Sequence, residues 1–193
     1  MIDDLPDDPT QLTAEMLTFL FRDGGLAPSN PGVEVAEVTT EPLAQGSAFL
    51  GSLARLNITW ADRDTALPNR FVAKVPTQDP GGRTVGKMLN VWVREAQFYA
   101  RLAPLVATPV PTCRANFISG NKALLLLDDL YPASAGDQLI GASADQAHAA
   151  VEGVRAGSEA GRHPNSALQG GAFGLPGSLR HAAGPSGVCT QKE

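Results

Sequence analysis

Hydrophobic and polar positions alternate in several short segments of the chain, as they do in half-buried β-strands. Such segments cover residues 33–40, 56–60 and 70–75. Two more apolar segments, residues 114–119 and 123–127, flank a Gly-Asn turn, and this arrangement predicts a hairpin. The pattern therefore predicts an antiparallel sheet within the first two thirds of the chain.

In other segments apolar residues recur at steps of three and four, which predicts amphipathic helices. The first expected helix begins near Asp8 and ends at Gly24, the second covers about residues 88–102, and the third runs from Ser143 to Glu152. The Pro- and Gly-containing segment 77–83 is expected to be a loop. Strands combined with a few separate helices define an α+β fold class.

The chain has 193 residues, of which 43% are hydrophobic and 18% charged, a balance typical of a globular domain. From Gly153 onward Gly, Ala, Ser, Arg and Pro dominate without periodicity, which predicts a disordered tail. A GC-rich gene translated in the wrong frame would produce such a tail, and a natural glycine-rich linker is the alternative. We divide the chain into an N-terminal helical segment (1–29), a sheet region (30–130), a segment that begins a helix (131–152) and the tail (153–193).

Charge and composition exclude several classes of function. A net charge of −5 without a basic stripe argues against nucleic acid as a partner. The longest apolar run, residues 123–127, is far shorter than the ~20 residues of a membrane span, and the acidic start lacks the pattern of an export signal. Cys113 and Cys189 have no metal-binding spacing, so we expect free thiols, no metal site and a cytoplasmic protein.

One carboxylate lies within the apolar side of the second expected helix. Glu95 comes three residues after Trp92 and four before Tyr99, so it should face inward with them. A carboxylate in that position needs a cation, and Lys74 on the preceding strand is the nearest candidate. Kinases hold nucleotide phosphates with a strand lysine that pairs with a helix glutamate. An ordinary solvent-exposed pair is the alternative.

A degenerate glycine loop precedes the lysine strand. Gly46, Ser47 and Gly51 fall within a stretch that keeps the first and last glycines of the G-x-G-x-x-G spacing. Backbone amides of such a loop can approach phosphates closely, although a plain hairpin turn would look the same. A strand rather than a helix follows, which excludes a Rossmann fingerprint, and the GK[ST] of a P-loop is absent.

The run of four leucines that ends at Leu127 is followed by Asp128 and Asp129. In a two-lobed kinase this run would be the last strand of the N-terminal lobe, and the residues after it would form the hinge that faces adenine. A buried strand followed by a turn is the alternative interpretation.

Together these segments resemble the aminoglycoside phosphotransferase superfamily and, within it, the ecdysteroid-kinase-like (CHK-type) branch. The resemblance covers roughly residues 8–152. It is carried by five segments in order, FVAKVPT at 71–77, REAQFY at 94–99, PVP at 109–111, LLLDDL at 125–130 and GDQ at 136–138.

The resemblance implies a protein-kinase-like fold that binds ATP and Mg²⁺ between two lobes and phosphorylates a small-molecule hydroxyl. By this match Lys74 would contact the nucleotide phosphates and Glu95 would orient Lys74. Residues 127–130, including Leu127, Asp128 and Asp129, would form the adenine-side hinge.

The family's catalytic and metal-binding aspartates lie in its C-terminal lobe, in H-x-D and D-x-D patterns that do not occur after the expected hinge. We therefore assign no catalytic residue and expect a nucleotide-binding N-terminal lobe that is inactive alone, with the C-terminal lobe missing. Two alternatives stay open. One is a non-enzymatic module that binds a nucleotide or a partner chain carrying that lobe, and the other is a non-functional gene fragment.

Overall fold

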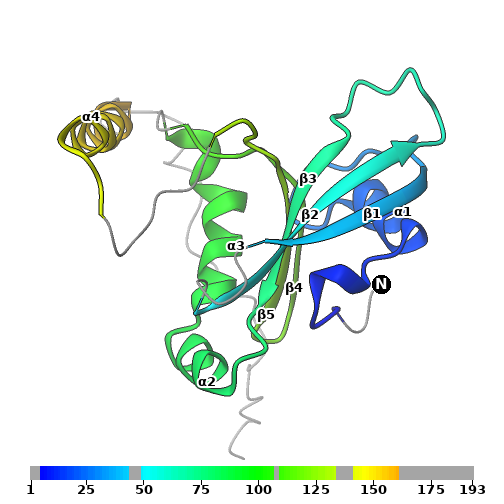
Figure 1. Cartoon of the computed structure of the whole chain (residues 1–193), viewed down its shortest axis with the longest axis horizontal. Helices are drawn as coiled ribbons and strands as arrows, with labels where there is room; N and C mark the ends of the chain where they lie inside the picture. The colour runs from blue at the N-terminus through cyan, green and yellow to red at the C-terminus, as the bar shows by residue number, and fades with distance from the viewer. Residues whose placement is uncertain (1–4, 44–48, 107–108, 134–140, 161–193) are drawn as a thin grey trace, which may run out of the picture. The chain divides into compact units, whose positions relative to one another are not determined.

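A computed structural model describes residues 5–43, 49–106, 109–133 and 141–160 of the chain. In this part of the chain five strands form one antiparallel sheet in the order β1-β2-β3-β5-β4 (Figure 1). The α+β class and the antiparallel sheet are as predicted. The strands are β1 (Val35–Leu43), β2 (Gly51–Trp60), β3 (Arg70–Pro76), β4 (Cys113–Ser119) and β5 (Lys122–Asp128).

The helix α1 packs on one face of the sheet and the helix α3 on the other (Figure 1). The helices are η1 (Pro9–Gln11), α1 (Ala14–Asp23), α2 (Pro80–Leu89), α3 (Val91–Arg101), η2 (Ala103–Leu105) and α4 (Ala144–Ala160). Within the described residues, none of these helices combines the length and the apolar character that crossing a membrane requires.

The leucine run of β5 contributes to two separate cores. Leu124 and Leu126 pack with α1 on one face of the sheet, while Leu125 and Leu127 pack with α3 on the other. Successive strand residues point to opposite faces, so a strand that is covered on both faces is apolar at every position. The hairpin of β4 and β5 and the burial of these leucines follow the prediction.

The segment predicted to be a loop, residues 77–83, contains the start of a helix, so that prediction was wrong. The carboxylate of Asp79 accepts a 2.6 Å bond from the N–H of Gly82, and Pro80 occupies the first helical position. Both features favour a helix N-terminus. Asn90, with φ 52°, ends α2 in the left-handed region, so α3 begins at Val91 rather than at Met88.

Two other helix boundaries differ from prediction. The helix α1 begins at Ala14 instead of near Asp8, because Asp8 caps the short η1 and Thr13 caps α1. The helix α4 begins after Ser143, as predicted, and continues to Ala160, so the prediction of a disordered tail from Gly153 onward was wrong for residues 153–160. The rest of the expected tail, residues 161–193, lies outside the described residues.

Candidate functional site

The site is built around an ion pair between β3 and α3. The Nζ atom of Lys74 lies 2.7 Å from Oε1 of Glu95, and the two side chains are 27% and 31% exposed. Phe71, Ala73 and Val75 point into the core beneath α1, so Lys74 projects from the opposite face, where α3 packs. The pairing expected from the sequence is therefore present, and it is partly shielded from solvent.

Gly51, at the start of β2, lies directly beside the stem of Lys74. A Cβ atom at Gly51 would come within 3.1 Å of the lysine Cε. The absence of a side chain at Gly51 therefore leaves room for the aliphatic part of Lys74 beside β2. Of the other residues predicted in this loop, Gly46 and Ser47 lie outside the described residues.

The residue just before Gly51 is held by two donors. The carbonyl oxygen of Leu50 accepts a 2.6 Å bond from the indole N–H of Trp92 and a 3.3 Å bond from the backbone N–H of Thr77. On the same segment, the carbonyl oxygen of Phe49 approaches Gly82 of α2 so closely that a Cβ there would collide with it. The end of the β1–β2 connection is thus fixed against the residue after β3 and against α2 and α3.

Trp92 was interpreted from the sequence as part of an apolar stripe, and its polar contact was missed. The side chain is 4% exposed, and its ring lies against Gly86 of α2. A buried indole N–H usually donates a hydrogen bond to an acceptor, so a tryptophan on the inward side of a helix could have indicated such a bond. The sequence pattern does not identify that partner, because Leu50 lies on a different element.

The predicted hinge residues have their carboxylates engaged within the protein. Asp128 accepts two 2.8 Å bonds from Arg114, and Asp129 lies 2.8 Å from Arg55 and 3.5 Å from Arg70. The hydrogen bonds to the Asp128 carboxylate raise the pKa of the Arg114 guanidinium. We therefore expect any ligand contact of this segment to come from its main chain rather than from these side chains.

The sequence pattern does not identify the arginine partners of this segment. Two adjacent aspartates at the end of a buried strand indicate that cations lie nearby, but the cations come from three other strands. The guanidinium carbon of Arg70 also lies 4.3 Å from the ring centre of Tyr131. Leu127 is 7% exposed and packs in the core beneath α3, so its side chain is part of that core.

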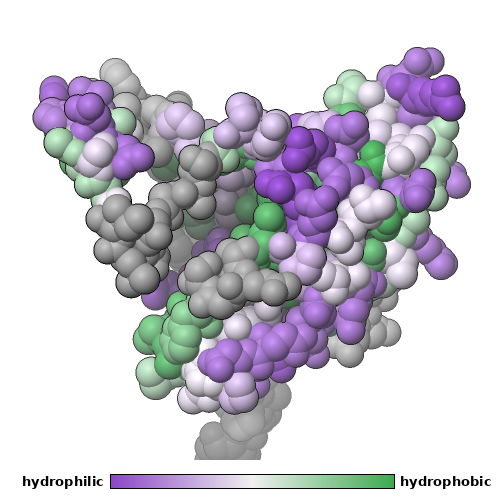
Figure 2. Space-filling view, in the orientation of Figure 1, coloured by the Kyte–Doolittle hydropathy of each residue, from purple (hydrophilic) through white to green (hydrophobic). Residues whose placement is uncertain are grey.

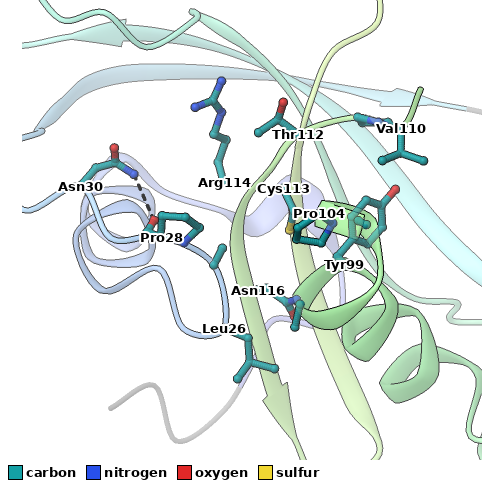
Figure 3. A pocket seen from close by; sticks show the side chains of 14 residues that line it. Leu26, Pro28, Asn30, Tyr99, Pro104, Val110, Thr112, Cys113, Arg114 and Asn116 are labelled. Carbon is teal, nitrogen blue, oxygen red and sulfur yellow. Dashed lines mark hydrogen bonds between the residues drawn. The ribbon is translucent and has the colours of Figure 1, made fainter. Parts of the chain in front are cut away.

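A separate pocket of about 700 Å³ lies between the segment after α1, the end of α3 and the start of β4. Tyr99, Pro104 and Cys113 gather at one end of this pocket (Figure 3). Neither Lys74 nor Glu95 lines it. The pocket is therefore distinct from the ion-pair site.

Two ionisable groups of this pocket are neutral near pH 7. Burial raises the pKa of the Cys113 thiol to about 12, and burial raises the pKa of the Tyr99 hydroxyl to about 12, with a smaller contribution from the Glu95 carboxylate. A thiol with that pKa is a poor nucleophile at physiological pH. The arrangement does not favour cysteine-based catalysis.

Apolar side chains are exposed around α2. Figure 2 shows hydrophobic residues gathered over this helix, and Met88, Leu89 and the nearby Phe49 are 75%, 49% and 59% exposed. Among the residues that the structure describes, no three His, Cys, Asp or Glu side chains are grouped as a metal site would require.

Comparisons with known proteins leave the family open. No protein-family model matches the chain, and no similar curated protein or solved structure was found.

Proposed function

We propose that the sheet face around Lys74 binds the phosphates of a nucleotide, with Mg²⁺-ATP as the expected ligand. The protein would then be the nucleotide-binding lobe of a small-molecule kinase of the aminoglycoside-phosphotransferase type. The observation that carries the proposal is the 2.7 Å pair between Lys74 and Glu95, with Gly51 beside the lysine stem.

The geometry of this pair favours a role in binding. Both side chains are about one-third exposed or less, so their charges interact in a medium less polar than water while the site stays open to a ligand. A lysine held by a carboxylate presents its remaining N–H bonds in a fixed direction, which lowers the entropic cost of binding a phosphate. Kinases use a strand lysine and a helix glutamate in this way.

The proposal concerns nucleotide binding by the described lobe. Transfer of a phosphoryl group to a small-molecule hydroxyl needs, in addition, a base and carboxylates that hold metal ions in line with the nucleotide. In the family that the sequence resembles, these residues belong to the C-terminal lobe.

Calorimetric titration of the full chain with Mg²⁺-ATP tests the proposal. We expect specific binding that Lys74→Ala abolishes and Glu95→Gln weakens. The control Lys87→Ala removes an exposed lysine of α2 and should leave the affinity unchanged. If the folded wild-type chain does not bind Mg²⁺-ATP, or if Lys74→Ala and Lys87→Ala bind equally well, the proposal is wrong.

A second candidate function is supported by the exposed apolar residues of α2. We propose, as the alternative, that Met88 and Leu89 contribute to a surface that binds a partner chain carrying the C-terminal lobe. Such apolar surface is commonly part of a protein–protein interface. A stoichiometric complex that forms with the wild type but not with a Met88→Ser/Leu89→Ser variant would support it, and equal complex formation would contradict it.

A further inference from the structure

The first turns of α3 contact two parts of the candidate phosphate site. We infer that Trp92 is a positioning residue for nucleotide binding, because it fixes the end of the β1–β2 connection while Glu95 fixes Lys74. This inference rests on the proposed nucleotide-binding function. It adds a residue that contacts the site's backbone and not the ligand.

The contact between Trp92 and Leu50 is short and shielded. The indole nitrogen lies 2.6 Å from the carbonyl oxygen of Leu50, and the tryptophan side chain is 4% exposed. The bond is partly buried, and its loss would leave the carbonyl with the longer 3.3 Å bond from the backbone N–H of Thr77. The bond therefore restrains the chain immediately before Gly51.

The two contacts of α3 come from the same side of the helix. Trp92 and Glu95 are three residues apart, and side chains at this spacing are neighbours on a helix surface. Trp92 reaches Leu50, and Glu95 reaches Lys74, whose stem lies against Gly51. A shift of α3 would consequently displace the lysine and the backbone beside it together.

A purely structural role for Trp92 is the alternative, and Trp60 provides a matched control. Trp60 is 8% exposed, and its indole N–H donates a 2.9 Å bond to the carbonyl oxygen of Pro68. It packs with α1 in the core on the opposite face of the sheet from Lys74. Replacement of either tryptophan by phenylalanine removes one indole donor and a similar volume, but only Trp92 contacts the candidate site.

The experiment compares the full chain with its Trp92→Phe and Trp60→Phe variants by two measurements. The first is calorimetric titration with Mg²⁺-ATP at a temperature where each variant is folded. The second is amide hydrogen exchange of residues 49–53 without nucleotide, with the β4–β5 hairpin as an internal reference. The exchange measurement does not depend on nucleotide binding.

We expect Trp92→Phe to weaken Mg²⁺-ATP binding about tenfold, the effect of losing one well-placed hydrogen bond, and Trp60→Phe to leave the affinity nearly unchanged. Exchange in residues 49–53 should accelerate in Trp92→Phe alone. If both variants bind like the wild type and exchange at 49–53 is unchanged, the inference is overturned while the proposed function stands. If the wild type does not bind Mg²⁺-ATP, the proposed function fails, and nucleotide positioning by Trp92 fails with it. In that case, unchanged exchange of residues 49–53 in Trp92→Phe would also show that the bond from Trp92 to Leu50 does not restrain this segment.

A second variant covers the case in which Trp92→Phe does not fold. Gly82→Ala places a methyl group against the carbonyl oxygen of Phe49 and the Cγ2 of Thr77, and it leaves the side chains of Trp92, Lys74 and Glu95 in the sequence. It should weaken Mg²⁺-ATP binding and accelerate exchange at residues 49–53. Wild-type affinity and wild-type exchange in this variant would contradict the premise that the position of residues 49–51 affects nucleotide binding, and the inference about Trp92 would fail with it.

Discussion

The side chain of Asn116 on β4 donates a 2.8 Å hydrogen bond to the backbone carbonyl of Ala96 on α3. Asn116 is 1% exposed, and its own backbone bonds to Gly24 and Leu26 at the end of α1. Asn116 therefore bonds to α3 on one face of the sheet through its side chain, and to the segment after α1 at the outer edge of β4 through its backbone. The contact holds α3, and with it Glu95, at a fixed distance from the sheet.

We predict that Asn116→Ala lowers the free energy of unfolding by about 1–3 kcal/mol, because it removes a buried hydrogen bond and leaves the Ala96 carbonyl without that donor. Urea denaturation of the two proteins measures the difference. Asn121→Ala, in the exposed β4–β5 turn, should change the stability by less than about 0.5 kcal/mol. Equal effects of the two substitutions would show that the buried bond does not stabilise the fold.

We predict that Gly86→Ala destabilises the protein although alanine favours helices. In an isolated helix this substitution would gain about 1 kcal/mol. Here the added methyl group would collide with the ring of Trp92, and overpacking of this kind costs about 1–3 kcal/mol. Thermal unfolding shows which effect is larger, because a net destabilisation lowers the melting temperature and a net stabilisation raises it. Gly32→Ala is the control, because a methyl group there meets nothing within 4 Å and should not destabilise the protein.

We predict that Asp7 makes a pH-dependent contribution to the free energy of unfolding. Hydrogen bonds from Lys122 and then Arg83 lower the pKa of its carboxyl from 3.8. A carboxyl whose pKa is lower in the folded state stabilises the fold above its unfolded pKa, and this contribution is lost as the pH falls through the folded pKa. The side chain is 43% exposed, so solvent screening limits the contribution to about 1 kcal/mol or less.

The stability difference between the wild type and Asp7→Asn should therefore be present near neutral pH and disappear in acid. Urea denaturation along a pH series measures it. The control Glu152→Gln neutralises an exposed carboxylate of α4. An Asp7→Asn effect that stays constant into acid would contradict the assignment of the ion pairs.

We predict that Cys113 reacts slowly with thiol reagents in the folded protein. Burial raises its pKa to about 12, so the reactive thiolate is depleted by several orders of magnitude near neutral pH, and access is limited as well. The rate is measured in a Cys189→Ser background, which leaves one thiol. Labelling should accelerate greatly in urea, and equally fast labelling with and without urea would show that the fold does not protect the half-buried Cys113 thiol.

The sheet was predictable because its strands carry local signals. The hairpin of β4 and β5 has a Gly-Asn turn between apolar runs, and β3 is bounded by prolines on both sides. The ion pair of Lys74 and Glu95 was predictable too, since a carboxylate on an apolar helix face requires a cation and one strand lysine lies nearby.

The remaining features depend on contacts between distant segments. The helix α2 was missed because glycine and proline lower helix propensity, while the cap at Asp79 and the contact of Gly86 with Trp92 compensate for them. The bond from Trp92 to Leu50 and the arginine partners of Asp128 and Asp129 join elements whose mutual position follows only from the folded chain.

The leucine run of β5 has a consequence for the register of the sheet. A slip by one residue exchanges the side chains of the two faces, and the alternation of hydrophobic and polar positions normally prevents it. Residues 124–127 are all leucine, so a shifted β5 would present nearly the same side chains to α1 and α3. The charges at the two ends of the strand distinguish the alternatives, because a slip would separate Asp128 from Arg114 and Lys122 from Asp7. In this strand, electrostatic contacts at the termini specify the alignment that hydrophobicity leaves degenerate.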